Sequence, residues 1–350
     1  MTASTRTRHV PPRLAALNAL IALVALVSLL GGCAQQFDLQ GHRGARGLAP
    51  ENSLPAFETA LRHGVSTLEL DVAMTRDGVL VIHHDLALNP DTARDASGHW
   101  IDAPGATLHS LSWAELQAYD IGRLKPGTRY AAQFPEQLPV DGTRIPRLAD
   151  LFELVRRSGN TRVRFDIETK LDPRRPEATP APEPFAKALV DALRQAGLQR
   201  RAQIQSFDWR TLQAVQRLAP EIPTAYLTAQ QPWLDNIGAP RKAAPAAPAA
   251  PAASAGSTGS AWTAGFQYRD HGSVPKMIHA AGGRIWSVYF GDIDADQFKQ
   301  AKALGLKVLV WTVNDAATIG RMIELGVDGL ITDRPDIARS VLDSRGIRPR

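Results

Sequence analysis

Hydrophobic and polar residues alternate along most of this chain with two different periods. The segment 68–72, Leu-Glu-Leu-Asp-Val, changes character at every second residue, as a strand with one polar face does. Just before it, the apolar residues of 54–61 recur at helical spacing. Strand-like and helix-like segments then continue to alternate as far as residue 342.

The expected strands are 37–40, 68–72, 162–170, 202–206, 224–227, 284–289, 307–311 and 329–332. The expected helices are 54–61, 113–119, 148–157, 184–195, 209–218, 274–281, 295–304, 316–325 and 335–342. Each of the eight strands is followed sooner or later by a helix, which predicts an α/β fold, a (β/α)8 TIM barrel. In such a barrel the functional residues lie at the carboxyl ends of the strands.

Two additions to the barrel are expected. Asp77-Gly78 is a hairpin turn signal, and the apolar residues 79–82 after it predict a β-hairpin extension of the second strand. The stretch 86–147 is polar and rich in turn residues, which favours a long cap loop near the site over a second domain.

Ala, Pro, Ser and Gly dominate residues 243–260, a composition that cannot bury a core. We expect a mobile low-complexity insertion at about 241–262 inside one domain that runs from residue 33 to residue 350.

The first residues have the layout of a bacterial lipoprotein signal peptide. Arg6, Arg8 and Arg13 precede an apolar run from 14 to 30, and Leu-Gly-Gly then stands directly before Cys33, as in a lipobox. We expect residues 1–32 to be removed and Cys33 to carry lipid. The catalytic part would then lie outside the cytoplasm, anchored to a bacterial membrane, most simply on its periplasmic side. The alternative is an uncleaved anchor, for which the run is short.

The net charge and the cysteine content limit which kinds of binding partner and which covalent cross-links we expect. Loss of 1–32 lowers Lys and Arg from 40 to 37 against 35 acidic residues, and this near-balance gives no reason to expect a nucleic-acid partner. No protein partner is indicated either. Cys33 is the only cysteine, which excludes an internal disulfide.

Three acidic residues lie on or at the ends of expected strands, where the functional residues of a TIM barrel are found. Glu69 and Asp71 share one face of the second strand, and Glu168 ends the third. Carboxylates placed together repel unless a cation neutralises them, and a hard divalent metal, Ca²⁺ or Mg²⁺, suits oxygen ligands. The alternative is a structural salt-bridge network with basic residues such as Arg43 or Lys170.

Motifs in this part of the chain resemble those of the glycerophosphodiester phosphodiesterase family. In order they are His42-Arg43-Gly44, Pro50-Glu51-Asn52, Glu69-Leu70-Asp71-Val72 and His84-Asp85, followed later by Trp311-Thr312-Val313-Asn314 and Gly329-Leu330-Ile331-Thr332-Asp333-Arg334-Pro335. The resemblance implies a TIM-barrel enzyme that uses a divalent metal to hydrolyse glycerophosphodiesters to sn-glycerol 3-phosphate and an alcohol. We interpret the last of these motifs as architectural.

The resemblance also implies roles for individual residues. His42 and His84 match the catalytic acid-base pair, and histidine exchanges protons near neutral pH. The triad of Glu69, Asp71 and Glu168 would bind the metal, while Arg43 and Lys170 would contact the phosphate. Three further residues complete the set: Trp311 as a wall for the glycerol carbons, and Glu51 and Asn52 in support of the metal shell. A packing tryptophan at the barrel rim is the structural alternative for Trp311, and a solvated loop acid and a helix N-cap are the alternatives for Glu51 and Asn52.

The chain departs from the family pattern after His84-Asp85. The family often carries an arginine and threonines there, whereas this chain has Leu88-Asn89-Pro90-Asp91-Thr92. This departure bears on the substrate contacts of the cap and not on the metal or the histidines. Two other functions stay open separately: a phospholipase-type phosphodiesterase acting on intact lipids or lysolipids, which the membrane anchor makes less remote, and a non-catalytic ligand-binding barrel.

Overall fold

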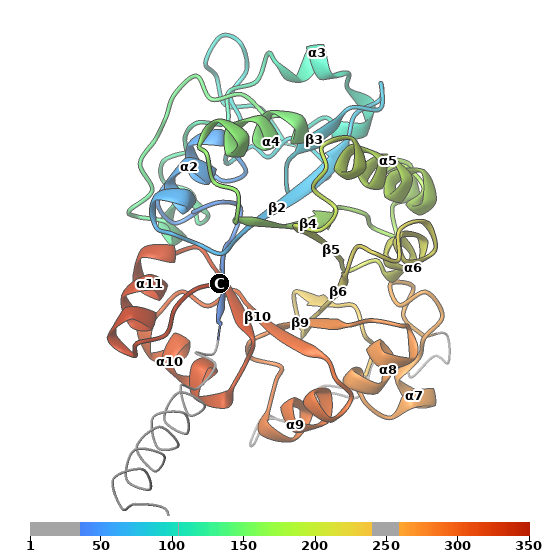
Figure 1. The fold of residues 1–350 in the computed structure, drawn as a ribbon. Helices are drawn as coiled ribbons and strands as arrows, with labels where there is room; N and C mark the ends of the chain where they lie inside the picture. Colours follow the sequence, from blue (N-terminus) through green and yellow to red (C-terminus); the bar gives the residue numbers. More distant parts are fainter. Residues whose placement is uncertain (1–35, 104, 240–258) are drawn as a thin grey trace, which may run out of the picture.

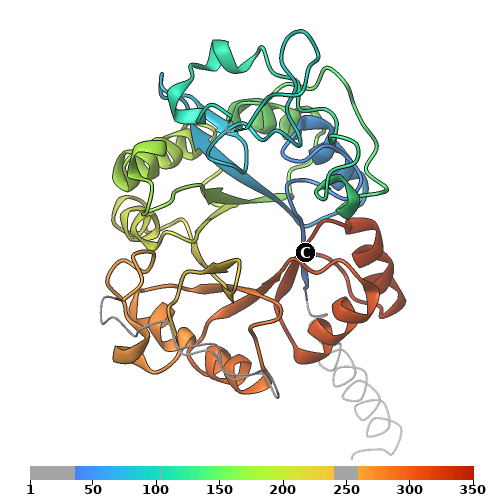
Figure 2. The same cartoon turned by 180° about the vertical axis from the view of Figure 1, so that it is seen from behind.

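The structure is a computed structural model that describes residues 36–103, 105–239 and 259–350. Figures 1 and 2 show a central ring of strands enclosed by helices. The ring strands are β1 (Asp38–Gly41), β2 (Thr67–Met74), β4 (Arg164–Thr169), β5 (Ala202–Ser206), β6 (Thr224–Thr228), β9 (Ile285–Tyr289), β10 (Lys307–Trp311) and β11 (Gly329–Thr332). All pair in parallel, and the pairing of β1 with both β11 and β2 closes the ring. The predicted (β/α)8 TIM barrel is confirmed.

The helices surround the ring and cover its apolar outer face. They are α2 (Leu54–Arg62), α3 (Trp113–Leu116), α4 (Leu148–Arg157), α5 (Pro182–Gln195), α6 (Trp209–Leu218), α7 (Tyr268–His271), α8 (Val274–Ala280), α9 (Ala295–Ala303), α10 (Ala316–Leu325) and α11 (Pro335–Ser344). Single 3₁₀ turns are η1 (Leu108–Ser110), η2 (Ala131–Gln133) and η3 (Pro176–Ala178). The predicted helix 113–119 forms only the short α3, and α7 was not predicted.

The period-two pattern of the strands separates two buried environments. On β4, Phe165 and Ile167 join the apolar core between strands and helices, while Asp166 and Glu168 belong to the opposite, inward face. Both acids are buried as well, at 0% and 6% exposure. Gln203 on β5 donates to Asp166 at 2.6 Å, so the inside of the ring is polar beside β4 and β5. The acidic residues that the alternating pattern of this strand placed on one face therefore point into the ring.

The hairpin and the cap lie beside β2. Strand β3 (Leu80–Ile82) pairs antiparallel with β2, which confirms the predicted hairpin. The segment that follows wraps over this side of the barrel, at the top of Figure 1. It packs on a separate apolar cluster that includes Val81, Leu88, Leu116 and Ile145. The cap is therefore an extension of the barrel with a small core of its own.

A short hairpin that the sequence did not predict follows β6. It consists of β7 (Gln230–Gln231) and β8 (Leu234–Asp235), and two-residue strands are too short to show a period. The predicted insertion, with its expected mobility, lies outside the described residues except for its end. Its last residue, Trp262, is buried at 8% exposure, so the insertion ends before Trp262. Residues 1–32 and Cys33 also lie outside the described residues.

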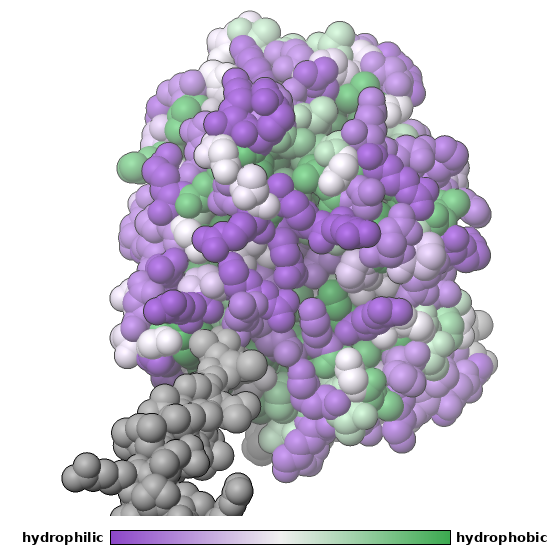
Figure 3. All heavy atoms as spheres, in the orientation of Figure 1, coloured by the Kyte–Doolittle hydropathy of each residue, from purple (hydrophilic) through white to green (hydrophobic). Residues whose placement is uncertain are grey.

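None of the helices in the described ranges has the length and apolar character that a membrane crossing requires. Figure 3 shows that one face of the molecule is mostly hydrophilic, with hydrophobic residues in small separate patches.

Candidate active site

The loop after β1 carries the first histidine. A Cβ atom on Gly41 would lie 2.2 Å from the carbonyl oxygen of Gly44, and Gly44 itself has φ +84°, so this turn requires glycine at both positions. The turn places His42 at the carboxyl end of β1. There its Nδ1 lies 2.7 Å from Oδ1 of Asp333, the residue that follows the adjacent strand β11.

Asp333 is a buried carboxylate held by several donors. Arg46 donates to it from Nε at 2.8 Å and from Nη2 at 3.0 Å, and Asn314 donates at 2.7 Å. Burial opposes its charge, but Arg46 and His42 outweigh that effect and hold the pKa of Asp333 well below its usual range. A permanently charged Asp333 fixes the imidazole with its proton on Nδ1. The other nitrogen, Nε2, then faces Glu69, whose Oε2 lies 3.9 Å away.

The second histidine follows β3 and has the same arrangement. Nδ1 of His84 lies 2.8 Å from Oδ1 of Asp85, and Asn89 holds the other oxygen of Asp85 at 2.7 Å. Burial, with the charges of Arg43 and Lys170, lowers the pKa of His84 to about 4. Burial and Arg46 lower the pKa of His42 too. Both imidazoles are therefore neutral near pH 7, each oriented by a carboxylate.

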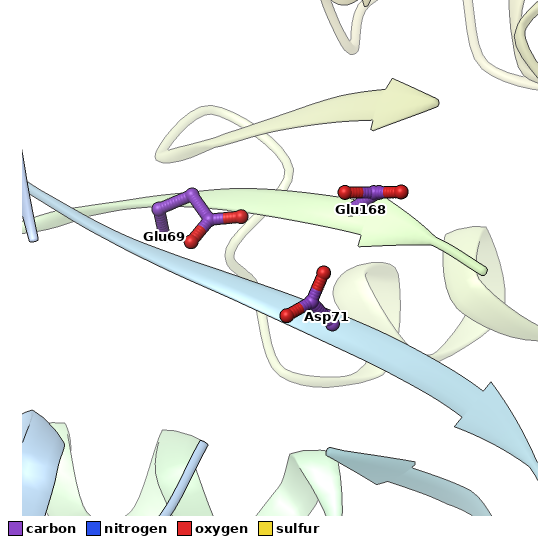
Figure 4. Close-up of side chains that lie close together, drawn as sticks. All are labelled: Glu69, Asp71 and Glu168. Carbon is purple, nitrogen blue, oxygen red and sulfur yellow. The ribbon is translucent and has the colours of Figure 1, made fainter. Parts of the chain in front are cut away.

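The three predicted metal ligands converge. Oxygens of Glu69, Asp71 and Glu168 all lie within 4.8 Å of one another, and we call these three residues the acidic triad. Figure 4 shows Glu69 and Asp71 on β2 and Glu168 on the neighbouring β4, with their carboxylates over the same stretch of the two strands. The parallel register that pairs Asp71 with Glu168 brings them side by side. All three residues are buried.

Fixed donors orient two members of the triad. The backbone N–H of Arg43 donates to Oε2 of Glu69 at 2.8 Å, and Gln205 donates to Oε1 at 3.0 Å. Asn52 donates to Oδ2 of Asp71 at 2.8 Å. Asn52 is not the N-cap of α2, a role that belongs to Ser53; its φ of 53° turns it back toward β2.

Basic residues also contact the triad, as the salt-bridge alternative expects. Lys170 lies 2.7 Å from Glu168 and 3.5 Å from Asp71, and Nε of Arg43 lies 3.3 Å from Asp71. Arg164 instead pairs with Asp38, at 3.1 Å.

The charges nevertheless fit a divalent cation. Arg43 also binds Glu51 at 2.6 Å, so four carboxylates face two cationic side chains, which leaves two negative charges. Oδ1 of Asp71 is buried without a hydrogen bond. A cluster of oxygen ligands with this excess charge and an unsatisfied oxygen is suited to a hard divalent metal. The acidic triad could hold such an ion.

Burial and mutual repulsion raise the pKa values of the triad, and the charge of Lys170 opposes them. Burial and Asp71 raise the pKa of Glu69 well above its usual range. Burial also raises the pKa of Glu168, to about 7, although Lys170 opposes the shift. At Asp71, burial is outweighed by Lys170, and the pKa is lowered. Without a metal the triad therefore retains protons near neutral pH.

Glu51 lies beside the triad and is not one of its members. It accepts hydrogen bonds from Arg43 and from the hydroxyl of Tyr130, on the cap. Burial opposes its charge, yet Arg43 and Arg46 lower its pKa. Glu51 therefore holds Arg43 in place and connects the loop after β1 to the cap.

These side chains open into one cavity of about 740 Å³. Both histidines, Glu69, Glu168, Arg43 and Lys170 line it, together with Trp311 at the end of β10; Asp71 lies beneath them, against Lys170. The indole Nε1 of Trp311 donates to Ser287 at 3.2 Å, which fixes the ring as part of the cavity wall. The structure thus brings the predicted site residues of the described chain to one place.

Sequence reasoning missed the partners of the histidines. Asp333 was interpreted as architectural, and Asp85 only as a mark of the motif. The available signal was position, because Asp333 directly follows the last strand and that strand must pair with the first in a closed barrel. Arg46 and Tyr130 carried no such signal.

We expect Asp333→Asn to lower kcat by about 10²-fold, because His42 loses the charge that fixes its orientation. The fold should also lose about 3 kcal/mol, since the buried Arg46 loses its counter-charge. Asp328→Asn is the matched control. Asp328 binds Lys302 at 2.8 Å and directly precedes β11, so it lies at the opposite end of this strand from Asp333 and His42. It should reduce stability and leave kcat unchanged. Equal kcat losses in the two variants would show that Asp333 is only structural.

Comparison with known proteins identifies the family to which the chain belongs. The model of the glycerophosphoryl diester phosphodiesterase family matches residues 42–337. A glycerophosphodiester phosphodiesterase of Bacillus subtilis is 26% identical over 86% of this chain and 84% of its own length. One of Caldanaerobacter subterraneus is 25% identical over 84% of this chain and 93% of its own.

Solved structures give the same result. A protein of Silicibacter pomeroyi DSS-3 is 33% identical, with a TM-score of 0.76 over 91% of this chain and 97% of its own. A phosphodiesterase of Oleispira antarctica, solved in complex with the product sn-glycerol 3-phosphate, is 22% identical with a TM-score of 0.60, which covers 87% of this chain and 96% of its own and shows the shared fold. On the family match over most of its length, this chain is an enzyme of the glycerophosphoryl diester phosphodiesterase family.

Proposed function

We propose that the enzyme hydrolyses glycerophosphodiesters to sn-glycerol 3-phosphate and an alcohol, with a divalent metal and two histidines. The observation that carries this proposal is the pair of carboxylate-oriented imidazoles in one cavity with the acidic triad. The names of the relatives agree with the substrate class, and the Oleispira antarctica protein was solved with the corresponding product.

Glu69, Asp71 and Glu168 would hold the metal, and their oxygens suit Mg²⁺ or Ca²⁺. When bound, such an ion neutralises charge on the phosphoryl oxygens. Lys170 lies between Glu168 and Asp71 and lines the cavity, so its ammonium group can bind a phosphate oxygen once the metal engages the carboxylates. Arg43, held by Glu51, contributes a second fixed positive charge.

The two histidines divide the proton transfers. One neutral imidazole takes the proton of the attacking hydroxyl, from water or from a neighbouring substrate hydroxyl, at Nε2. The other must first take up a proton from solvent at Nε2, and as an imidazolium it gives this proton to the departing alkoxide. In both residues Nδ1 is engaged by a carboxylate, which leaves Nε2 for the reaction. Since Asp333 and Asp85 stabilise the imidazolium that forms, proton transfer to either histidine becomes easier.

Trp311 would receive the glycerol carbons. Its ring packs edge-to-face with Phe207, with ring centroids 5.5 Å apart, and both line the cavity. A flat apolar wall of this kind binds the carbon face of glycerol while the phosphate is held at the charged end.

Release of sn-glycerol 3-phosphate from glycerophosphoglycerol and glycerophosphocholine tests the proposal. Product from either diester supports it. Cleavage of lysolipids with no turnover of a water-soluble diester would instead establish the phospholipase-type alternative, which the cavity volume and the expected membrane anchor favour. A protein that binds these compounds without cleaving any of them would be the non-catalytic barrel.

We expect metal affinity to depend on pH. Because burial raises the pKa of Glu168 to about 7 and this residue must lose its proton to bind metal, affinity should rise about tenfold or more per pH unit below about pH 7. Calorimetric titration of the metal-free protein in buffers of different ionisation enthalpy measures this affinity and the protons released. Constant affinity between about pH 5.5 and 7 would contradict the assignment.

The signal-peptide pattern and Cys33 support a lipid-anchored enzyme outside the cytoplasm, on the periplasmic side of a bacterial membrane. Membrane fractionation of the wild type and of Cys33→Ser tests this location, since the variant should leave the membrane fraction.

A further inference from the structure

The cavity has two walls on opposite sides of the barrel. In the ring order, β4 and β10 stand four strands apart, directly across the axis. Trp311 ends β10 and forms the first wall with Phe207 and Trp233, whose ring centroids lie 5.5 Å and 6.1 Å from that of Trp311. A phosphodiester bears two alcohols. If Trp311 receives the glycerol, the other wall faces the alcohol that leaves.

The second wall is apolar. It consists of Leu86, Leu88 and Pro90 from the segment after His84, Leu171 from the loop after β4, and Trp262. Leu88 and Pro90 occupy the segment in which the family often has an arginine and threonines. The residues that differ from the family pattern are therefore part of this wall. Apart from the indole N–H of Trp262, the side chains of this wall are hydrocarbon and offer an alcohol no hydrogen bond.

One guanidinium group projects over this wall. Arg174 lies four residues after Lys170 on the same loop, and its Cζ is 5.1 Å from the ring centroid of Trp262. Asp172 accepts hydrogen bonds from Nε at 2.9 Å and from Nη2 at 2.8 Å. Within the described residues Nη1 has no hydrogen-bond partner, and Arg174 lines the cavity. The arginine therefore keeps a donor for a bound molecule.

Acidic residues near this wall are already engaged. Both oxygens of Asp172 bind Arg174, and Asp85 holds His84. Arg175, which also lines the cavity, pairs with the exposed Glu177 at 4.0 Å. The face of Trp262 that could attract a quaternary ammonium group is taken by the guanidinium of Arg174. Among the described residues of this wall, a cationic head group would find a guanidinium group over the ring of Trp262 and no carboxylate without a basic partner.

We propose that the second wall binds the leaving alcohol and selects an uncharged, hydroxylated alcohol over a quaternary ammonium alcohol. The apolar surface accepts the carbon skeleton, Nη1 of Arg174 donates to a hydroxyl oxygen, and the guanidinium group of Arg174 keeps a quaternary ammonium group from the ring face of Trp262. This inference rests on the proposed function, because it assigns the leaving group of that reaction.

Competing hydrolysis of glycerophosphoglycerol and glycerophosphocholine by the metal-loaded enzyme tests this selectivity. We expect kcat/KM to be about tenfold higher for glycerophosphoglycerol, which corresponds to one like-charge contact partly screened by solvent. Arg174→Gln should reduce that ratio about fivefold or more, mainly by improving glycerophosphocholine. Arg174→Lys keeps the charge and should keep the preference, which separates charge from packing on Trp262.

Arg217→Gln is the matched control. Arg217 lies on α6, pairs with Glu183 at 3.7 Å and is not part of the cavity lining, so the ratio should not change. Equal kcat/KM for the two diesters, or an unchanged ratio in Arg174→Gln, would overturn the selectivity and leave the proposed function intact. Failure to release sn-glycerol 3-phosphate from either diester would instead refute the proposed function.

Discussion

Replacement of His84 by alanine is expected to lower kcat by about 10³-fold while the protein stays folded. The imidazole provides one of the two proton transfers, and general acid-base groups contribute about 10²-fold to 10⁴-fold. The side chain is about one-third exposed, at 32%, and its hydrogen bond to Asp85 is local, so little packing is lost. His42→Ala should cause a loss of similar size.

Three further measurements make this prediction specific. His84→Asn keeps a hydrogen-bonding group for Asp85 without a basic nitrogen, and it should be as inactive as the alanine variant. Imidazole added to His84→Ala should restore part of the activity if a proton carrier is what is missing. His63→Ala, at the end of α2, should behave like wild type. Near wild-type turnover by His84→Ala would remove His84 from the mechanism.

The barrel was predictable because each strand and helix carries its own periodic signal. β5, β10 and β11, along with α6 and α10, begin and end at the predicted residues. Period two identifies β4 as a strand although both of its faces are buried, since its inward face is polar. The acidic triad could be predicted for the same reason, because residues two apart on β2 share a face.

The remainder depends on contacts that no local pattern encodes. Asp333 meets His42 across 291 residues, and its sequence surroundings resemble an ordinary strand-to-helix junction. The two strands of the β7–β8 hairpin are too short for a period. Asn52 adopts a positive φ and binds Asp71, whereas its place before a helix suggested an N-cap. Trp262 joins the cavity although it directly follows a low-complexity run.

Removal of the metal is expected to reduce activity at least about 10³-fold, the largest effect that we predict. An ion at the acidic triad supplies several kcal/mol of transition-state stabilisation, and chelation would return the site to the state in which Lys170 bridges Glu168 and Asp71. Activity with glycerophosphoglycerol is measured after chelator treatment, and again after Mg²⁺ or Ca²⁺ is restored. The ion that restores the rate identifies the preferred metal.

Glu168→Gln distinguishes loss of the metal from other effects of the chelator. The variant keeps the size of the side chain and removes one charge from a buried cluster with excess negative charge, so the metal-free fold should be at least as stable as wild type. Metal at about a hundred times its dissociation constant should stabilise wild type by about 2.7 kcal/mol and stabilise the variant far less. This thermal readout does not depend on turnover. The wild-type enzyme could prove fully active after complete demetallation, with a melting temperature that metal does not raise. That result would show that the four carboxylates and the two cationic side chains form only a structural network.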